Sequence, residues 1–431
     1  MLARLLSALA ALLLIAGPAQ STTPEHDSLD RIAEDFVKLT LEAGEREEGY
    51  VDAYYGPPEW AAAAKAAPRD LATLRADARR LAVRLDKVTV GQAPLQARRR
   101  VFLAGQVKAA ETRLSMALGQ KFKFADEAEG LFGVRPVLKP LSHYDAVLAR
   151  IETLVPGEGP LWQRVDAYQN QFVVPADRLD AVMRAGIAEC RRRTAAHIAL
   201  PDKEQFTLEF VKNKSWSGYN WYKGNAVSLI QINTDLPIRV SRAIDLGCHE
   251  GYPGHHALNM LLEQKLAKGQ GWVEFSVYPL YSPQSLIAEG TANYGIDLAF
   301  SEADKVAFER EVLFPLAGLD PAGAARQVAL GEAMKDLAGA RLTIAQMYLD
   351  GEIDRETAID LAQKYQLISR ARAEQSIRFT ENYRSYVINY GLGEEMTKAY
   401  IEAAAPDAAG RWKAFERLIS EPTVPGDLLK R

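Results

Sequence analysis

The sequence has little cysteine: Cys190 and Cys248 are the two cysteines in a chain of 431 residues. Two cysteines do not make the disulfide framework of a small secreted domain. They could pair in an oxidising compartment, but the sequence alone favours two separate thiols over a bridge.

The chain also has little excess of charge of either sign. It contains 52 basic and 56 acidic residues, for a net charge of -4, and its basic runs are short, as at residues 98–100. A nucleic-acid-binding protein usually presents a basic face. We therefore expect no nucleic-acid partner.

Long apolar runs are missing beyond the N-terminus, so we expect no membrane span. The run from Leu5 to Ala16 follows Arg4 and precedes small residues, which is typical of a secretory signal peptide and too short for a span. We predict a signal peptide over residues 1–19, cleaved after Ala19. The mature protein is then exported, either periplasmic or secreted.

Most of the remaining chain carries apolar residues at helical spacing, which predicts a mainly α-helical fold of the α+β class. Three such stripes cover residues 29–41, after the possible N-cap Ser28, residues 179–187 and residues 330–344. Each stripe is most simply the buried face of a helix.

The length allows two or three domains, at roughly 150 residues each. Clusters of glycine and proline at residues 56–58, 156–160 and 318–323 predict turns between helices. We divide the mature chain into a helical N-terminal region, 20–160, and a catalytic region, 161–431. One continuous domain, 20–431, is an equal alternative, and the oligomeric state is not specified by the sequence.

Two stretches break the helical pattern. Residues 206–210 alternate apolar and polar side chains, and residues 227–233 form a short, mostly apolar run. Both patterns predict strands, with the aromatic segment 216–222 between them. We therefore expect a small mixed sheet beside the histidine-rich segment that follows.

Three of the six histidines lie in the sequence HEGYPGHH at residues 249–256. Zinc hydrolases of the HExxH type place two imidazoles one helical turn apart, with the Glu after the first as general base. Here Pro253 stands four residues after His249. On a straight helix His255 would lie roughly 120° around the axis and His256 roughly 10 Å along it, so neither could share a metal with His249.

The Pro-Gly pair offers a way to break this helix. Pro253 clashes with the carbonyl of His249, and Gly254 permits unusual backbone turns. If two residues are looped out, His255 becomes the second ligand, which is the arrangement we favour. If three are looped out, His256 does, and a helix merely ended by Pro-Gly is the alternative without a metal.

A third ligand is expected from residues 285–294, where Glu289 is the single acid among apolar or small residues. A buried carboxylate without a partner is costly, so metal coordination explains Glu289 at least as well as a salt bridge in the core. Asp245, four residues before His249, could accept the other imidazole N–H. Asn293, four residues after Glu289, could orient its carboxylate.

The pattern HExxPGHH followed by a Glu-Gly helix resembles a large bacterial family long labelled a domain of unknown function, related in plan to the gluzincin metallopeptidases. The matching stretches are residues 249–256 and 289–294, with weaker likeness over residues 205–395. The resemblance implies a mostly helical zinc peptidase with one Zn²⁺ held by His249, His255 and Glu289.

The same resemblance implies that Glu250 is the catalytic base and that Tyr390, in a Tyr-x-x-Gly sequence, stabilises the oxyanion. The preceding residues 384–386 depart from the family's usual Pro-Gly-Gln type of sequence, which leaves Tyr386 as a rival. Either tyrosine would also serve as a helix-packing aromatic. Two imidazoles and a carboxylate suit zinc without excluding manganese or cobalt.

These observations predict an exported zinc-dependent metallopeptidase that uses metal-activated water and a Glu base. The strand around Leu229 and Gln231 would pair with an extended peptide substrate. An aromatic wall would contact its side chains, built from Trp216, Tyr219, Trp221 and Tyr222. The alternatives are a zinc hydrolase of a non-peptide amide or ester, and a helical binding protein with a structural zinc site.

Overall fold

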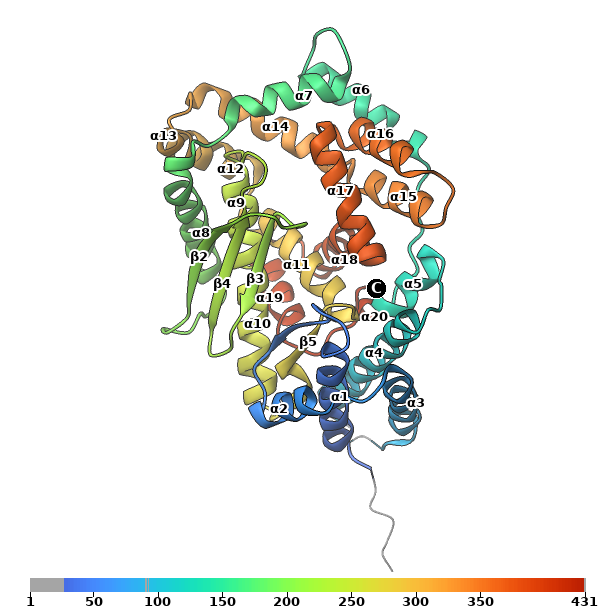
Figure 1. The fold of residues 1–431 in the computed structure, drawn as a ribbon. Helices are drawn as coiled ribbons and strands as arrows, with labels where there is room; N and C mark the ends of the chain where they lie inside the picture. Colours follow the sequence, from blue (N-terminus) through green and yellow to red (C-terminus); the bar gives the residue numbers. More distant parts are fainter. Residues whose placement is uncertain (1–26, 90, 92, 430–431) are drawn as a thin grey trace, which may run out of the picture.

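The computed structural model describes residues 27–89, 91 and 93–429 (Figure 1). The predicted signal peptide lies outside these residues. The fold is mainly α-helical with a small amount of sheet, as predicted. Among the described residues, no helix combines the length and apolar character needed to cross a membrane.

The N-terminal half begins with a helix whose apolar stripe is buried, as its spacing predicted. The side chain of Ser28 caps this helix by accepting a hydrogen bond from the backbone N–H of Arg31. The helices of this half are α1 (Leu29–Gly44), α2 (Pro58–Ala66), α3 (Leu71–Lys87), α4 (Pro94–Ala117), α5 (Phe124–Phe132), α6 (Asp145–Leu154), α7 (Leu161–Gln169) and α8 (Leu179–Ala195).

The C-terminal half carries the longest buried helix, α11, which packs along α18. The predicted helix over residues 330–344 is in fact two helices, because the chain turns between Lys335 and Ala338. The helices of this half are α9 (Arg242–Leu246), α10 (His255–Leu262), α11 (Pro283–Ala299), α12 (Glu302–Phe308), α13 (Phe314–Ala317), α14 (Ala324–Lys335), α15 (Ala338–Leu349), α16 (Arg355–Gln366), α17 (Arg370–Tyr383), α18 (Ile388–Ala404), α19 (Ala408–Leu418) and α20 (Pro425–Leu428).

Two small sheets interrupt the helices. The predicted strands are present as β2 (Gln205–Val211) and β4 (Val227–Asn233), which are parallel, and the aromatic segment between them forms β3 (Gly218–Tyr222), antiparallel to β4. The strand order is β2-β4-β3. A second, two-stranded sheet joins β1 (Val51–Tyr54) to β5 (Val277–Pro279), so the N-terminal region reaches the centre of the molecule.

The apolar interior forms two clusters. The larger one joins α1, α3, α4 and α5 to the histidine-bearing segment and to α11 and α18. The smaller one joins residues 144–165 to residues 330–377, which close the upper part of the ring of helices in Figure 1. Each cluster therefore combines residues from before and after position 160.

The two cysteines form a disulfide between Cys190 of α8 and Cys248. The expectation of separate thiols was therefore wrong. Helix α8 packs against α9 and the turn that follows it, which brings positions 58 residues apart to a Cα–Cα distance of 5.3 Å. The bridge ties the residue directly before His249 to a helix of the core.

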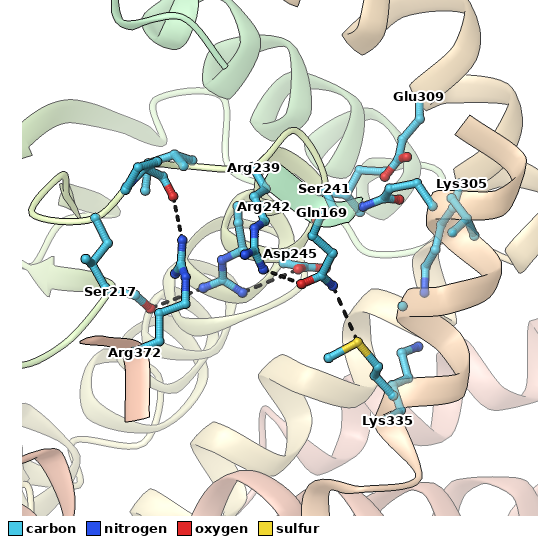
Figure 2. Close-up of a pocket in the computed structure, with 18 of the residues that line it drawn as sticks. Gln169, Ser217, Arg239, Ser241, Arg242, Asp245, Lys305, Glu309, Lys335 and Arg372 are labelled. Atoms are coloured by element: carbon cyan, nitrogen blue, oxygen red, sulfur yellow. Dashed lines mark hydrogen bonds and ion pairs between the residues drawn. The ribbon is translucent and has the colours of Figure 1, made fainter. Parts of the chain in front are cut away.

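Two cavities open between the sheet and α9 on one side and α17 on the other. The larger, of about 310 Å³, has charged walls and is shown in Figure 2. The smaller, of about 60 Å³, is lined by His249, His255 and Glu289. The two cavities are called the charged cavity and the metal cavity below.

Candidate metal centre

The helical path breaks between His249 and His255. A π-helical turn, Gly247–Gly251, continues α9 and is followed by Tyr252 in an extended conformation. A Cβ on Gly254 would lie 1.9 Å from the carbonyl oxygen of His249, so only glycine fits where the chain doubles back. Helix α10 then begins at His255.

This break brings the first and second histidines of the cluster, His249 and His255, together. The Nε2 atoms of His249 and His255 lie 3.2 Å apart, and the two rings are perpendicular. The loop at the Pro-Gly pair therefore places His255, rather than His256, beside His249, which is the arrangement expected when two residues are looped out.

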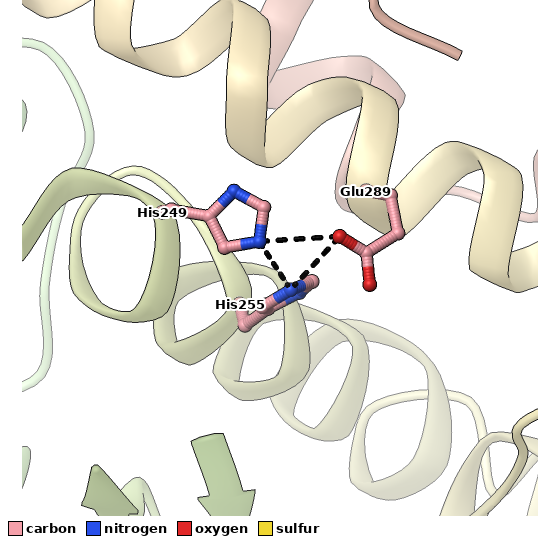
Figure 3. Close-up of side chains that lie close together, drawn as sticks. All are labelled: His249, His255 and Glu289. Atoms are coloured by element: carbon pink, nitrogen blue, oxygen red, sulfur yellow. Dashed lines mark hydrogen bonds and ion pairs between the residues drawn. The ribbon is translucent and has the colours of Figure 1, made fainter. Parts of the chain in front are cut away.

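Glu289 reaches the same point from α11 (Figure 3). Its Oε2 lies 3.1 Å from Nε2 of His249 and 3.7 Å from Nε2 of His255. Helix α11 is fixed against α18 by close backbone packing, since a Cβ on Gly290 would lie 2.4 Å from the carbonyl oxygen of Gly393. The three side chains form a group that could hold a metal ion.

The chemistry of this group fits a divalent metal. Ligand atoms bound to a tetrahedral zinc at about 2.1 Å lie roughly 3.4 Å from one another, close to the three separations observed. The Oε2 atom of Glu289 is buried and accepts no hydrogen bond, which is costly unless a cation is bound there. Burial opposes ionisation of Glu289, but His255 and His249 outweigh it and hold the pKa of this carboxyl below its usual range.

The outer ring nitrogen of His249 has a different partner from the one expected. Its Nδ1 lies 2.8 Å from Oδ1 of Asn293, so Asn293 orients the imidazole rather than Glu289. Asp245 pairs instead with Arg242, 3.3 Å away, and lines the charged cavity. The spacing of four residues failed for Asp245 because the π-helical turn that includes His249 changes which side chains share a face. Asn293 lies on the regular helix α11 and contacts His249 of another segment, which spacing along one helix does not record.

Two tyrosines from the C-terminal part border the cluster. The hydroxyl of Tyr386 donates to Oε1 of Glu289 at 2.7 Å, which orients the carboxylate in the way expected of Asn293. Tyr390 lies on α18 with its ring stacked on that of His249, at a centroid distance of 6.3 Å. Burial raises the pKa of both phenols well above the usual value, so both stay protonated donors.

Glu250 lines the metal cavity beside His249. It is 4% exposed, and its carboxylate packs so closely on β3 that a Cβ on Gly218 would lie 2.8 Å from Oε1. The side chain of Asn220 fixes the backbone by donating to the Glu250 carbonyl at 2.6 Å. Burial raises the pKa of Glu250 above its usual value.

His256 is turned away from the cluster and fully buried. Its Nδ1 lies 2.7 Å from the hydroxyl of Ser228, and its Nε2 lies 3.2 Å from Glu204. Burial opposes ionisation of Glu204, but hydrogen bonds from His256, Tyr252 and Arg191 lower its pKa to about 2. Both ring nitrogens of His256 therefore have partners away from the cluster, whereas Nε2 of His255 lies beside His249 and Glu289.

Some of the aromatic residues predicted to bind substrate line the metal cavity, and the others do not. Tyr219 lines the metal cavity, together with Trp216. Tyr222 is buried with its hydroxyl on Glu263, and the indole of Trp221 donates to Gln231 at 2.9 Å. These last two aromatics therefore belong to packing around the sheet.

The predicted peptide-pairing strand is also in a different position from the one expected. Leu229 and Gln231 lie on β4, which is hydrogen-bonded on both sides, to β2 and to β3. A central strand has no free backbone groups for a peptide. The outer strand on the side of the metal cavity is β3, within the part of the chain that the structure describes.

Asp52 of β1 lines the metal cavity and was missed by the sequence analysis. The hydroxyl of Tyr219 donates to its carboxylate, and burial raises the pKa of Asp52 to about 7. The signal that could have found it is a lone acid in a short aromatic and β-branched stretch, residues 50–55, which lies between glycines at positions 49 and 56.

Comparisons with known proteins give information on the fold alone. No protein-family model matches the sequence, and no curated protein matches it significantly. A candidate lipoprotein from Colwellia psychrerythraea has a similar structure, with a TM-score of 0.52 and 14% identity, covering 83% of this chain and 68% of that chain. The M32 carboxypeptidase of Deinococcus radiodurans R1 aligns at a TM-score of 0.38 and 15% identity, over 93% of each chain.

Proposed function

We propose that the protein is an exported zinc-dependent metallopeptidase. The observation that carries the proposal is the convergence of two imidazole Nε2 atoms and a buried, unpartnered carboxylate oxygen in one cavity, with Glu250 beside them. Three protein ligands in a cavity are typical of catalytic zinc, whereas structural zinc usually has four. This favours an enzyme over a binding protein with a structural metal.

His249, His255 and Glu289 would hold the ion, and Asn293 and Tyr386 would orient two of these ligands. Bound zinc supplies a Lewis acid and makes water a stronger nucleophile near neutral pH.

Glu250 takes the proton of the attacking water and returns it to the leaving amine. A buried carboxyl with a raised pKa is suited to both steps, since it holds a proton more readily than an exposed one. Tyr390 donates a hydrogen bond to the oxyanion that develops on the scissile carbonyl. Its raised pKa keeps the phenol protonated for this role.

A peptide substrate is favoured over other amides by the outer edge of β3. The backbone groups of Ser217 and Lys223 face β4, as their hydrogen bonds to residues 233 and 227 require. Strand alternation then turns the backbone groups of Gly218 and Asn220 away from β4. Both residues line the metal cavity, where an extended peptide could add to the sheet.

Export is supported by the apolar leader at residues 5–16 and by the pairing of Cys190 with Cys248. Such bridges persist in oxidising compartments.

The test is hydrolysis by the zinc-loaded protein of a panel of peptides, compared with cell-wall fragments and simple esters. Peptide cleavage by the parent should fall about a thousandfold in Glu250→Gln, with the bound zinc unchanged. Cleavage of non-peptide amides alone would favour the alternative hydrolase. Undiminished cleavage in Glu250→Gln would contradict the mechanism.

A further inference from the structure

The charged cavity and the metal cavity are two parts of one cleft. On the sheet side, Ser217 lines the first and its neighbour Gly218 the second. On α17, Gln375 lines the charged cavity, and Phe379, one helical turn later, lines the metal cavity. A molecule extending from the metal centre along this cleft therefore enters the charged cavity.

Cations outnumber acids in the charged cavity, with five basic and three acidic side chains in its walls. Most of the basic groups are paired. Lys305 and Lys335 share Asp297 and Glu332, and Arg239 contacts Asp166 at 2.5 Å.

Arg372 has no acidic partner among the described residues. Its guanidinium donates to the carbonyl oxygen of Pro237 at 2.8 Å, a neutral acceptor. Burial lowers the pKa of Arg372 to about 10, and the nearby charges of Arg239 and Arg242 act in the same direction, while Asp166 opposes them. Three guanidinium groups that repel one another beside a cavity favour the binding of an anion between them (Figure 2).

The acidic walls of the cavity do not cancel this charge. Asp245 is paired with Arg242 at 3.3 Å. Burial raises the pKa of Glu309 to about 8, with Asp245 adding to the rise and Lys305 opposing it, so Glu309 is largely neutral at pH 7. Arg372 remains the basic side chain of this cavity that has no ion-pair partner among the described residues, since the nearby Asp166 is paired with Arg239.

We propose that the charged cavity binds a carboxylate of the peptide substrate, held by Arg372 with Arg242 and Arg239, on the C-terminal side of the cleaved bond. The proposal rests on the peptidase function proposed above. Guanidinium forks bind carboxylates through two parallel hydrogen bonds, which a lysine or a neutral donor does not reproduce.

The direction of the peptide follows from β3. This strand runs from the charged cavity toward Tyr222, so a peptide antiparallel to it points its C-terminus into the charged cavity. A parallel peptide would place its ammonium group among the guanidinium groups. Arg372 lies seven residues before Phe379 on α17, about 10 Å along the helix, which an extended chain spans with roughly three residues. The carboxylate should therefore lie roughly one to three residues beyond the cleaved bond.

Binding to a hydrolytically inactive protein separates this proposal from the function on which it rests. The protein is zinc-loaded Glu250→Gln. The probes are two pentapeptides of the same sequence, one with a free C-terminal carboxylate and one with an amidated C-terminus. Their dissociation constants are measured by calorimetry, before and after adding Arg372→Gln. The matched control is Arg370→Gln, which removes the same charge two residues away on α17, where Arg370 pairs with Glu356 outside the cavity.

We expect Arg372→Gln to weaken binding of the free acid about tenfold or more and to leave the amide unchanged, with no effect from Arg370→Gln. An amidated peptide with Asp or Glu near its C-terminus distinguishes the source of the carboxylate. Tight, Arg372-dependent binding of that peptide assigns the cavity to an acidic side chain rather than to the chain terminus.

Equal losses for the acid and the amide would make Arg372 a structural residue and overturn the proposal. The proposal would also be overturned if binding of the free acid were weakened by Arg341→Gln instead of by Arg372→Gln. The guanidinium of Arg341 stacks on Phe379 and Tyr390 at the metal cavity, so the carboxylate would then lie there. Absence of peptide cleavage by the parent protein, with acid-selective binding retained, would overturn the peptidase function and leave the carboxylate site standing.

Discussion

The two cavities of the cleft differ in the sign of the charge that lacks a partner. In the metal cavity the unsatisfied atom is a carboxylate oxygen, Oε2 of Glu289, beside two imidazole nitrogens. In the charged cavity the guanidinium of Arg372, beside two further arginines, has a neutral hydrogen-bond acceptor but no acidic partner among the described residues. A buried carboxylate oxygen without a partner is costly, and a half-buried guanidinium without an acidic partner favours an anion, so each cavity indicates a ligand of opposite charge.

The two cavities also differ in how their walls are built. The metal cavity is built on α11 and on the helix break held by Gly254 and the Cys190–Cys248 bridge. The charged cavity is built from long side chains on α9, α14 and α17, which can adapt to different ligands. The first arrangement suits one ion in a fixed geometry, and the second suits variable substrates.

After the thousandfold loss expected of Glu250→Gln, the next largest effect should come from removing the hydroxyl of Tyr390. Tyr390→Phe should lower kcat for peptides by about a hundredfold, because it removes one donor to the oxyanion while keeping the ring stacked on His249. Steady-state kinetics of the zinc-loaded protein measure this. The matched control is Tyr400→Phe on the same helix, and a Tyr390→Phe protein with normal kcat would transfer the role to another group.

Much of the fold could be predicted from the sequence, because apolar spacing records which face of each element is buried. It located α1, β2 and β4, and the order of residues around Pro253 and Gly254 indicated that the helix must break. Glu289 stood out as a lone acid in an apolar helix.

The contacts across the chain could not be predicted in this way. Asp52 of β1 and Arg372 of α17 reach the cleft through tertiary packing that spacing does not record. Asp245 was assigned by helical periodicity, which fails across the π-helical turn, and Asn293 contacts a histidine of another segment, which spacing along α11 does not record. The central place of β4 depends on strand order, which no local pattern specifies.

A smaller effect is expected on zinc affinity when a residue that orients a metal ligand is changed. Asn293→Ala removes the acceptor on Nδ1 of His249 and should weaken zinc binding about tenfold to a hundredfold, as loss of such partners usually does. Competition with a chelator of known affinity measures the change. Asn293→Asp keeps an acceptor and should restore most of the affinity, whereas equal losses in both variants would point to a packing defect.

The smallest effect belongs to the charged cavity. The folded pKa of Glu309, about 8, lies above the ordinary value of 4.5, so ionisation of this buried carboxyl destabilises the fold as pH rises between these values. Glu309→Gln should therefore gain stability over the parent on going from pH 5 to pH 6, on the order of 1 kcal/mol. Urea unfolding at the two pH values measures it, and a difference independent of pH would show that Glu309 is ionised at both.

The most direct test of the central claim is the zinc content of the protein after removal of metal and equilibrium dialysis against zinc. We predict about one zinc per chain in the parent and in Glu250→Gln, and nearly none in Glu289→Ala, because only the last variant removes a ligand oxygen. A parent protein that binds no zinc, or a Glu289→Ala variant that keeps its zinc, would contradict the account.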